Sequence, residues 1–251
     1  MTRQFTVSCR KSNAAGPDHR AVLASLPAHF RVVADGHADA AYTSLESPPA
    51  GARVLVCDCL ETACSTAAIP TIPAWTYLPR MEADPCFAEA RSQSFEMISC
   101  LITVADAAKG QLRQALLEQL AVLRTLTGAE PSVRAFQHDA RGYRAVVRVG
   151  SAAGSMIGRV SPLAWDTLQF DAVGKEHRLD ITMDAETLAR PASIRLFGAG
   201  GLRQAMPIHQ GSHRLTWLKV HAFLCGRIRA SELPTVNAAD VDAVARSFDG
   251  A

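Results

Sequence analysis

Among the residues that could do chemistry, three of the seven cysteines lie in one short stretch. Cys57, Cys59 and Cys64 lie close together, and thiolates are ligands that zinc prefers. Cys57 and Cys59, however, lie in a strand-like run, where alternating side chains point to opposite faces. The seven cysteines form an odd set without paired C-x-x-C spacing, and several lie in apolar runs where a thiol packs as a small hydrophobe. We therefore expect no metal site here.

Histidine and glycine provide two further candidates. His213 and His221 are two helical turns apart, close to one face of a helix if it begins that early, whereas His209 lies beyond Gly211. Metal ligation would need a third group from elsewhere in the chain, so we expect none. The glycine-rich stretch Gly198–Gly201 invites comparison with a phosphate-binding loop, but it lacks the Lys-Ser/Thr ending of a P-loop. A hairpin turn is the expected role.

The composition is that of a globular protein. The chain has 251 residues, of which 48% are hydrophobic and 20% charged, enough for one large or two small cores. A net charge of +2 with scattered arginines does not indicate a nucleic-acid partner. We find neither a long apolar run nor the apolar region of a signal peptide, so we expect a cytoplasmic protein without membrane contact.

One long helix organises the elements that would position these side chains. Between Gln111 and Thr127, leucines recur at helical spacing, which predicts that one face is buried. Gly128 follows directly and suits the left-handed residue that ends a helix. An apolar run precedes the helix and a train of strand-like runs follows it. We expect this helix to pack on a sheet.

The N-terminal third has the pattern of parallel strands. A strand, a helix beginning near Pro17 and a second strand predict a right-handed parallel crossover. The stretch from Pro79 to Ser94 is polar and is predicted to be irregular, as at a domain boundary. The predicted strands are Phe5–Cys9, Phe30–Ala34, Arg53–Cys57 and, between two prolines, Trp75–Leu78.

The C-terminal two thirds have the pattern of an antiparallel meander followed by helices. Short runs of strand character are separated by glycine-containing turns. After His213 a helix is predicted in which Leu215, Leu218, Ala222 and Cys225 share one face, and Asn237 is a natural N-cap for a last helix over Ala238–Phe248. The predicted strands are Ser132–His138, Arg144–Val149, Ser155–Ser161, Thr167–Ala172, His177–Met183 and Ser193–Phe197.

Taken together, several segments resemble the Gfo/Idh/MocA oxidoreductases. The resemblance is carried by His19–Leu26 leading to Asp35, by Leu123–Gly128, by Leu168–Asp184 and by the closing Pro234–Val241. It implies an α/β protein with a reduced Rossmann-like domain over residues 1–85. It also implies an α+β domain over residues 86–251 with a mostly antiparallel open sheet. The chain is shorter than members of that family usually are, and the missing length falls among the helices of the nucleotide domain.

The nucleotide-binding loop that the resemblance implies departs from its pattern. A Rossmann loop needs G-x-G-x-x-G so that the pyrophosphate can approach the backbone. Aligning on His19 places Lys11, Asn13 and Gly16 at the three glycine positions, so only the packing glycine remains. The side chain of Asn13 would occupy the space of the pyrophosphate. Ordinary cofactor binding is therefore expected to be weak or absent.

A rebuilt cofactor site is the alternative. Arg10, Lys11 and Ser12 can hold a phosphate through side chains instead of backbone amides. Asp35 matches the carboxylate that binds ribose hydroxyls in NAD enzymes, although an acidic residue at the start of a turn is equally ordinary. No cofactor is expected, and NAD(P) is the cofactor if the site is rebuilt.

The two positions to which the resemblance assigns chemistry have also changed. The family's Glu-Lys-Pro segment matches Tyr77-Leu78-Pro79, and leucine transfers no proton. On the helix where the family carries a catalytic histidine and an aspartate, this chain has Glu118 and Ala121. Glu118 is the candidate catalytic residue if a dry pocket raises its pKa, while a solvated or paired charge on a helix face is the simpler interpretation.

Three classes of function follow. The chain is a partner or scaffold subunit that keeps the sheet of the family for homo- or hetero-oligomer assembly, or a non-redox enzyme or small-molecule-binding protein. The alternative is an NAD(P)-dependent reductase of an imine or carbonyl with unusual cofactor contacts. Because the loop, the lysine and the histidine are all lost, we favour the first two classes over ordinary hydride transfer.

Overall fold

The chain folds into two compact units, one of which is built from two separate parts of the sequence. The first unit comprises Met1–Trp75 and Gly211–Val241, and the second comprises Thr76–Gln210 and Asp242–Ala251. The expected ranges, 1–85 and 86–251, differ from this division because a C-terminal segment returns to the first unit. The computed structural model describes residues 3–9, 19–34, 37–42, 49–57, 69–105, 111–162, 166–185, 192–206, 209–235 and 237–249.

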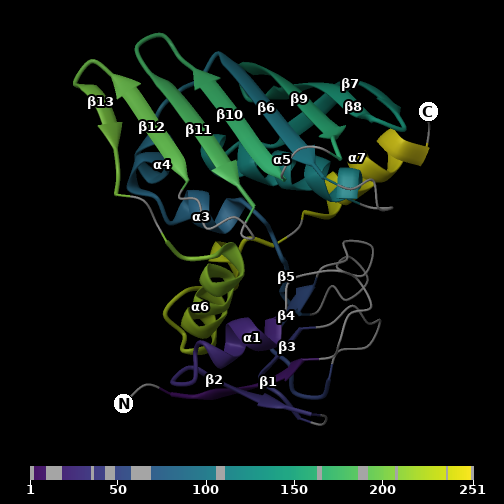
Figure 1. Ribbon diagram of the computed structural model, residues 1–251, viewed down its shortest axis with the longest axis vertical. Coiled ribbons are helices and arrows are strands. Elements are labelled where there is room, and N and C mark those ends of the chain that lie inside the picture. Colours follow the sequence, from purple (N-terminus) through teal and green to yellow (C-terminus); the bar gives the residue numbers. More distant parts are fainter. Residues whose placement is uncertain are drawn as a thin grey trace. The chain divides into compact units, whose positions relative to one another are not determined.

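The first unit is built on a parallel sheet of five strands in the order β2-β1-β3-β4-β5 (Figure 1). Helix α1 (His19–Ala24) connects β1 to β2, and the two strands are parallel, as predicted. The residues of β3, β4 and β5 are all buried, as expected for strands covered on both faces. The strands are β1 (Phe5–Cys9), β2 (Phe30–Val33), β3 (Ala40–Tyr42), β4 (Val54–Cys57) and β5 (Thr71–Pro73).

Two of these strands were not predicted, and one predicted strand is wrong. β3 and β5 have only three residues each, too few to show a period. The predicted strand Trp75–Leu78 instead leads into a helix, α3 (Leu78–Glu82). Pro79 favours that outcome because proline is pre-organised for the first turn of a helix.

Helix α6 (Ser212–Leu224) completes the core of the first unit. Its buried face carries Trp217, Val220 and Leu224, which join the cluster formed by the parallel strands. Leu218 and Cys225, which share the face noted in the sequence, are partly buried and pack against the same cluster. A short 3-10 turn, η1 (Ala230–Glu232), follows the helix.

The second unit is built on a sheet of eight strands in the order β13-β12-β11-β10-β6-β9-β8-β7. It is antiparallel except for one pair, β6 with β9, at its centre. A simple meander was expected; instead β6, which precedes the long helix, inserts between two later strands. The strands are β6 (Met97–Val104), β7 (Pro131–Asp139), β8 (Gly142–Val149), β9 (Ala152–Val160), β10 (Thr167–Val173), β11 (Arg178–Asp184), β12 (Ser193–Gly198) and β13 (Gly201–Gln204).

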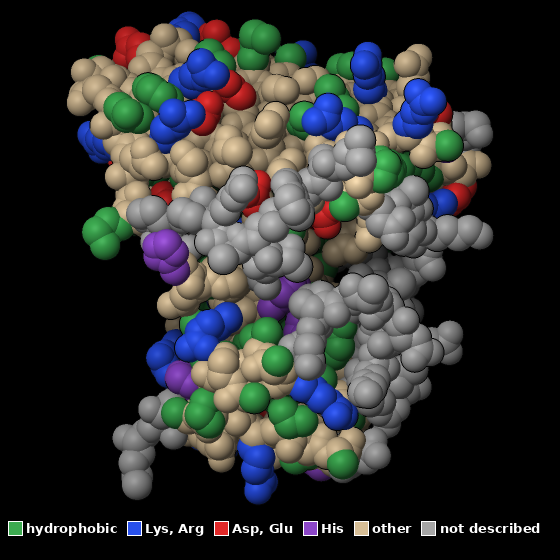
Figure 2. Space-filling view, viewed as in Figure 1, with side chains coloured by type: hydrophobic (Ala, Val, Ile, Leu, Met, Phe, Trp, Pro, Cys, Tyr) green, Lys and Arg blue, Asp and Glu red, His purple; other side chains and the backbone are tan. Residues whose placement is uncertain are grey.

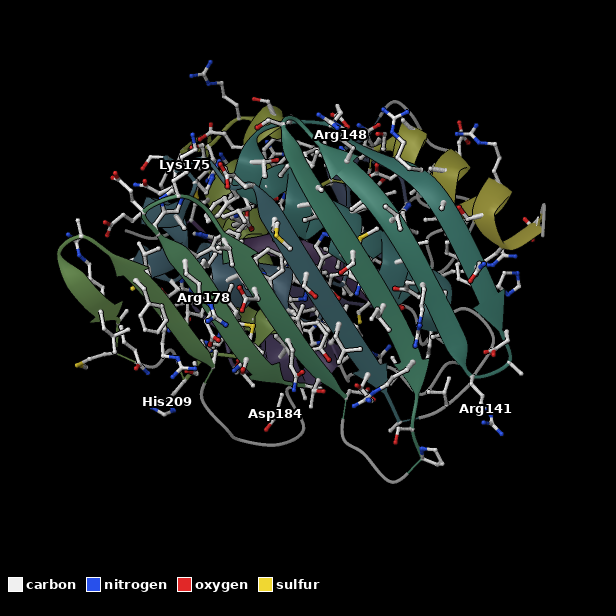
Figure 3. The ribbon with its side chains drawn as sticks, turned by 90° about the horizontal axis from the view of Figure 1, so that it is seen from above. Arg141, Arg148, Lys175, Arg178, Asp184 and His209 are labelled. Atoms are coloured by element: carbon white, nitrogen blue, oxygen red, sulfur yellow. The ribbon has the colours of Figure 1, made fainter. Side chains whose placement is uncertain are left out.

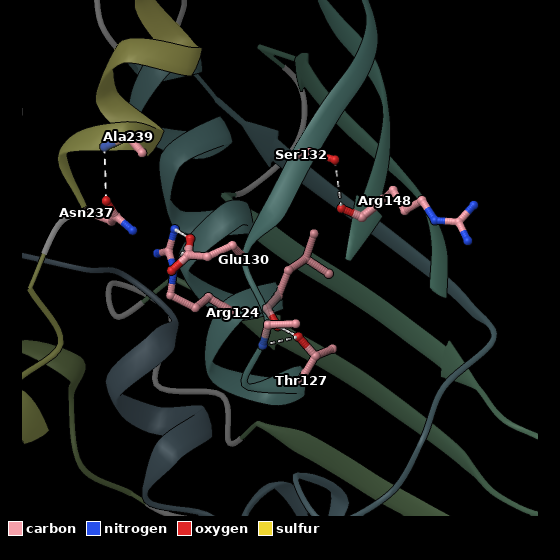
Figure 4. A network of polar contacts seen from close by, with 9 residues as sticks. Arg124, Thr127, Glu130, Ser132, Arg148, Asn237 and Ala239 are labelled. Carbon is pink, nitrogen blue, oxygen red and sulfur yellow. Dashed lines mark hydrogen bonds and ion pairs between the residues drawn. The ribbon is translucent and has the colours of Figure 1, made fainter. Parts of the chain in front are cut away.

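Helix α5 (Gln111–Thr127) packs on this sheet with the bounds predicted from the sequence. Gly128 adopts a φ of 67°, the left-handed conformation expected of a C-terminal glycine. The hydroxyl of Thr127 donates to the carbonyl of Leu123, and Arg124 pairs with Glu130 (Figure 4). Burial extends further than the predicted single face, because every residue from Ala115 to Leu123 is buried.

Two short helices occupy the segment that was predicted to be irregular. Helix α3 is followed by α4 (Pro85–Ala90), and their Met81 and Phe87 side chains are fully buried. Asp84 caps α4 by accepting a 2.7 Å hydrogen bond from the amide of Cys86. The prediction of an irregular boundary was therefore wrong. Each helix has only five or six residues, too short for a periodic signal.

Helix α7 (Ala238–Asp249) begins at the predicted N-cap. The side-chain oxygen of Asn237 accepts from the amide of Ala239 at 3.0 Å (Figure 4). At the other end of the helix, Phe248 packs against Phe136 of β7, with ring centroids 5.0 Å apart. None of the described helices is long and apolar enough to span a membrane.

A buried polar network ties α5 to the sheet. The amide nitrogen of Gln119 donates to the carbonyls of Cys100 and Ile157, on neighbouring strands, at 3.0 and 2.9 Å. Its oxygen accepts from the hydroxyl of Tyr143 at 2.7 Å. Gln119 is fully buried, so these bonds replace those it loses to water. The ring of Tyr143 lies over Gly158, its cross-strand partner.

We predict that Gly158→Ala destabilises the second unit by about 1–3 kcal/mol, the usual cost of overpacking. A Cβ at this position would lie 2.1 Å from the Tyr143 ring, so the ring must move away from Gln119. Urea unfolding of both proteins measures the effect. Gly200→Ala is the matched control, since its Cβ meets nothing closer than Arg203 at 3.5 Å. Equal stability of both variants would contradict this account of Tyr143.

Candidate functional site

The predicted cofactor residues follow the carboxyl ends of strands in the first unit. In the strand order β2-β1-β3-β4-β5, the point where the order reverses lies between β1 and β3. Ligands of open α/β sheets bind outside the carboxyl ends of the strands at such a point. Residues Arg10, Lys11, Ser12, Asn13 and Gly16 come directly after β1, and Asp35 comes after β2; all six lie outside the described residues.

A buried cluster of rings lies at the end of β3 in the same unit. His19, at the start of α1, stacks on Tyr42 with ring centroids 4.0 Å apart. The indole N–H of Trp217 donates to Nδ1 of His19 at 3.1 Å, so the neutral ring carries its proton on Nε2. His213 packs edge-on against His19 at 4.9 Å. The histidine that anchors the family alignment is therefore part of the core, and no local pattern indicated its pairing with Trp217.

The metal candidates do not come together in the part of the chain that the structure describes. His221 is buried against Phe5, and its Nε2 lies 3.0 Å from the carbonyl of Arg3. His209 belongs to the second unit. Cys57 is buried in β4, whereas Cys59 and Cys64 lie outside the described residues. Among the described residues, no three His, Cys, Asp or Glu side chains are grouped to hold a metal ion.

Glu118 is the predicted site residue that the structure places in full. It lies on α5, is only 2% exposed, and points at the backbone where α3 begins. Its Oε1 accepts hydrogen bonds from the amides of Tyr77 and Leu78 at 2.6 and 3.0 Å. Its Oε2 accepts from the amide of Thr76 at 3.2 Å. Tyr77 makes no side-chain cap of its own, so Glu118 caps the short helix from a distant part of the chain.

The surroundings of Glu118 shift its acidity in opposing directions. Burial raises the pKa of Glu118 to about 7, while the hydrogen bonds from Leu78, Tyr77 and Thr76 act to lower it. Burial also raises the pKa values of the Tyr77 phenol and the Cys100 thiol, the titratable groups coupled to Glu118. The raised pKa values keep both groups neutral at physiological pH, so neither adds a charge beside Glu118.

This geometry joins the two positions to which the resemblance assigned chemistry. Leu78 stands at the lysine position and Glu118 at the histidine position, and they are bonded through a backbone amide. Leu78 is buried, as is Ala121 at the aspartate position. A pKa near 7 suits a general acid, but both carboxylate oxygens of Glu118 already accept hydrogen bonds from backbone amides. Glu118 is not solvated, as one of the two simpler interpretations held, but is bonded to backbone amides. Its catalytic role stays a prediction.

Sequence reasoning missed the polar residues around Tyr77. Arg80 of α3 is only 4% exposed, and its Nη1 donates to the carbonyl of Asp184 at 2.8 Å. Asp166 accepts from the amide of Ala105 at 2.5 Å, just beyond the end of β6. Asp166 and Asp184 both contribute to the raised pKa of Tyr77. These residues are far apart in the sequence, and Arg80 resembled any surface arginine in a polar stretch.

The arrangement of the two sheets can be compared with that of known folds. A Rossmann-like parallel sheet with helices, joined to a larger, mostly antiparallel sheet, is the arrangement implied by the resemblance to the Gfo/Idh/MocA oxidoreductases. Comparison with solved structures confirms this fold across nearly the whole chain. No family model matches the sequence, and no curated protein does.

Three of the similar solved structures illustrate the range of this fold. An oxidoreductase from Sinorhizobium meliloti aligns with a TM-score of 0.70 at 12% identity, covering 99% of this chain and 98% of that one. UDP-N-acetylglucosamine 3-dehydrogenase GnnA from Acidithiobacillus ferrooxidans aligns with a TM-score of 0.64 at 8% identity, covering 98% of this chain and 96% of that one. The transcriptional regulator Gal80p from Kluyveromyces lactis aligns with a TM-score of 0.64 at 11% identity, covering 99% of this chain and 91% of that one. Identities this low establish a shared fold alone.

The burial of Glu118 predicts how stability depends on pH. Its pKa is about 7 in the folded chain, against an ordinary value of 4.5, so folding favours the protonated form. The wild-type protein should therefore lose roughly 3 kcal/mol of stability from this group as pH rises from 4.5 through 7, at about 1.4 kcal/mol per pH unit. Glu118→Gln mimics the protonated form and should lack this loss.

Urea unfolding of wild type and Glu118→Gln at pH 5 and pH 8 measures the difference. We expect similar stabilities at the lower pH and a more stable variant at the higher pH. Glu89→Gln, which changes a partly exposed carboxylate on α4, is the control and should not alter the wild-type slope in this way. If Glu118→Gln costs more stability at pH 8 than at pH 5, the three amides outweigh burial and the sign is reversed.

Proposed function

We propose that this chain is a degenerate Gfo/Idh/MocA-like protein that no longer performs ordinary hydride transfer. It acts as a partner or scaffold subunit, or binds a small molecule without redox chemistry. One observation carries the proposal. At the position of the family's catalytic histidine, Glu118 accepts hydrogen bonds from backbone amides through both carboxylate oxygens. A group held in this way positions a helix. To transfer a proton to a substrate it would first have to give up bonds that cap α3.

The open face of the antiparallel sheet supports a role in assembly. Helix α5 contacts β6 to β9 and α4 contacts β12 on one face, and no described helix of the unit covers the other. Figure 3 looks onto that face. Four large hydrophobic side chains that point outward from it are 41–66% exposed: Met97, Val146, Val173 and Leu202. Contiguous exposed apolar groups are typical of a protein contact, and two of these residues, Met97 and Val173, lie opposite each other on neighbouring strands.

A reductase is the alternative, and two observations favour it. The predicted phosphate-binding residues leave the sheet at its switch point, where open α/β sheets bind nucleotides. The pKa of Glu118 near 7 is also what a general acid at neutral pH needs. In this alternative, NADPH or NADH binds through Arg10, Lys11 and Ser12, and the substrate is an imine or carbonyl.

We predict that millimolar NADH or NADPH leaves the melting temperature and the tryptophan fluorescence unchanged. Asn13 stands where glycine would let the pyrophosphate meet the backbone, so the usual contact is missing. A ligand present at a hundred times its dissociation constant would add about 2.7 kcal/mol to stability, which a thermal scan detects. Asn13→Gly alone should not create binding.

The opposite result would favour the reductase. If either nucleotide binds at micromolar concentration, and Lys11→Ala or Arg10→Ala removes binding, the phosphate is held by side chains. Arg31→Ala, an exposed arginine on β2, is the matched control and should bind as wild type does. Turnover that is lost in Glu118→Gln while the protein stays folded would then make Glu118 catalytic.

A further inference from the structure

Charge is distributed unequally over the open face of the eight-stranded sheet. On β8 the outward side chains are Arg144, Val146 and Arg148, all exposed, and on β9 Arg159 is exposed beyond Ile157. We call these five residues the arginine patch. No described carboxylate pairs with its three arginines, and the outward positions of β6, β8 and β9 carry none. The patch is therefore a basic surface whose charges have no acidic partner among the described residues.

The register makes the patch continuous with apolar surface. Arg144 lies opposite Ile157, and Ile157 lies opposite Leu101 of β6. Four residues further along β8, Arg148 lies opposite Ala153 of β9, and Ala153 lies opposite Met97 of β6. Between these two rows, Val146 lies opposite Ser155, which lies opposite Ser99, so the arginines share this surface with aliphatic side chains and two serines. In Figure 3, Arg148 lies at one end of these strands and Arg141, on the β7–β8 turn, lies at the other.

The other half of the same face is neutralised by its own ion pairs. Asp180 pairs with Arg195 at 2.8 Å, and Arg178 bonds Asp171, all across neighbouring strands β10 to β12. Over the antiparallel sheet in Figure 2, basic side chains stand toward the β7–β9 side, whereas basic and acidic side chains alternate toward β10–β13. The face as a whole has an excess of positive charge concentrated at one side.

We infer that the arginine patch docks an acidic segment of a different protein, whose carboxylates meet Arg144 and Arg148 and whose apolar side chains cover Val146 and Met97. The inference rests on the proposed role of this sheet face in assembly and specifies the chemistry of the partner. Arginine suits it because a planar guanidinium binds a carboxylate with two parallel hydrogen bonds. Arginine and methionine are also enriched in protein interfaces, and arginine is among the residues that most often contribute large binding energies.

Two other occupants fit this surface less well. A second copy would bring arginines against arginines, or against Asp171 and Asp180, which are already paired within the chain. A single-stranded nucleic acid needs aromatic side chains on which bases stack, and the outward positions of β6, β8 and β9 carry none. The acidic protein segment matches both the charge and the aliphatic character of the patch.

The test uses a fluorescein-labelled peptide in which glutamates alternate with leucines, titrated with the full chain and followed by anisotropy. Saturable binding that weakens as salt is added is expected. Arg144→Glu with Arg148→Glu should reduce affinity about tenfold or more, since close charge pairs contribute at least this much. Lys175→Glu, an exposed charge reversal on the β10–β11 turn, is the matched control and should bind like wild type.

Three outcomes of the titrations would overturn the inference, and sedimentation offers a fourth. The three are no saturable binding of the acidic peptide, equal affinity of the double variant and the control, and tighter binding of oligothymidine that the double variant abolishes. Sedimentation of the same proteins separates this inference from the proposed function. A wild-type dimer that the double variant dissociates would make a second copy the occupant, with sheet-face assembly retained. Binding of NADPH with turnover would instead remove the proposed function itself.

Discussion

The burial of α5 on nearly all sides is the constraint on which the second unit depends. A helix enclosed in this way cannot leave a polar side chain without a partner, because an unpaired buried group costs several kcal/mol. Glu118 and Gln119 are adjacent residues in the middle of the enclosed segment. Gln119 bonds two strands and Tyr143, and Glu118 bonds the start of α3. The two side chains thus fix the helix to the sheet and to its neighbouring helix.

The same constraint bears on function. Water exclusion raises the pKa of Glu118 toward neutrality, a change that also prepares catalytic acids. What separates the two roles is the direction in which the carboxyl group faces. Here it accepts hydrogen bonds from three consecutive amides, those of Thr76, Tyr77 and Leu78, at the beginning of α3. A perturbed acidity is therefore a consequence of packing as much as a sign of chemistry, and the hydrogen-bond partners decide between them.

The two faces of the eight-stranded sheet differ in character, and so do the two halves of its outer face. Its inner positions bury leucine, isoleucine and phenylalanine against α5 and α4, while its outer positions carry polar and charged groups together with exposed hydrophobic side chains such as Met97 and Val146. Along β10 to β12 those charges neutralise one another across strands, which stabilises the sheet without a partner. Along β8 and β9 they do not, so the electrostatic potential there is available to another molecule.

The sequence by itself determined the elements with a strong local signal. The long helix, its glycine end, the Asn237 cap and the alternating strands of the second unit follow from period and capping chemistry, which act within a few residues. The type of fold followed from their order and from the family resemblance. The same local signals did not predict the short strands β3 and β5 or the short helices α3 and α4.

Only the tertiary structure decided the rest, because those features depend on contacts between distant parts of the chain. The insertion of β6 beside β9, the return of α6 to the first core and the pairing of His19 with Trp217 are long-range arrangements that no local period encodes. The role of Glu118 belongs with them. A glutamate on a helix has the same sequence pattern whether it meets water or a backbone, and burial by other elements determines which it meets.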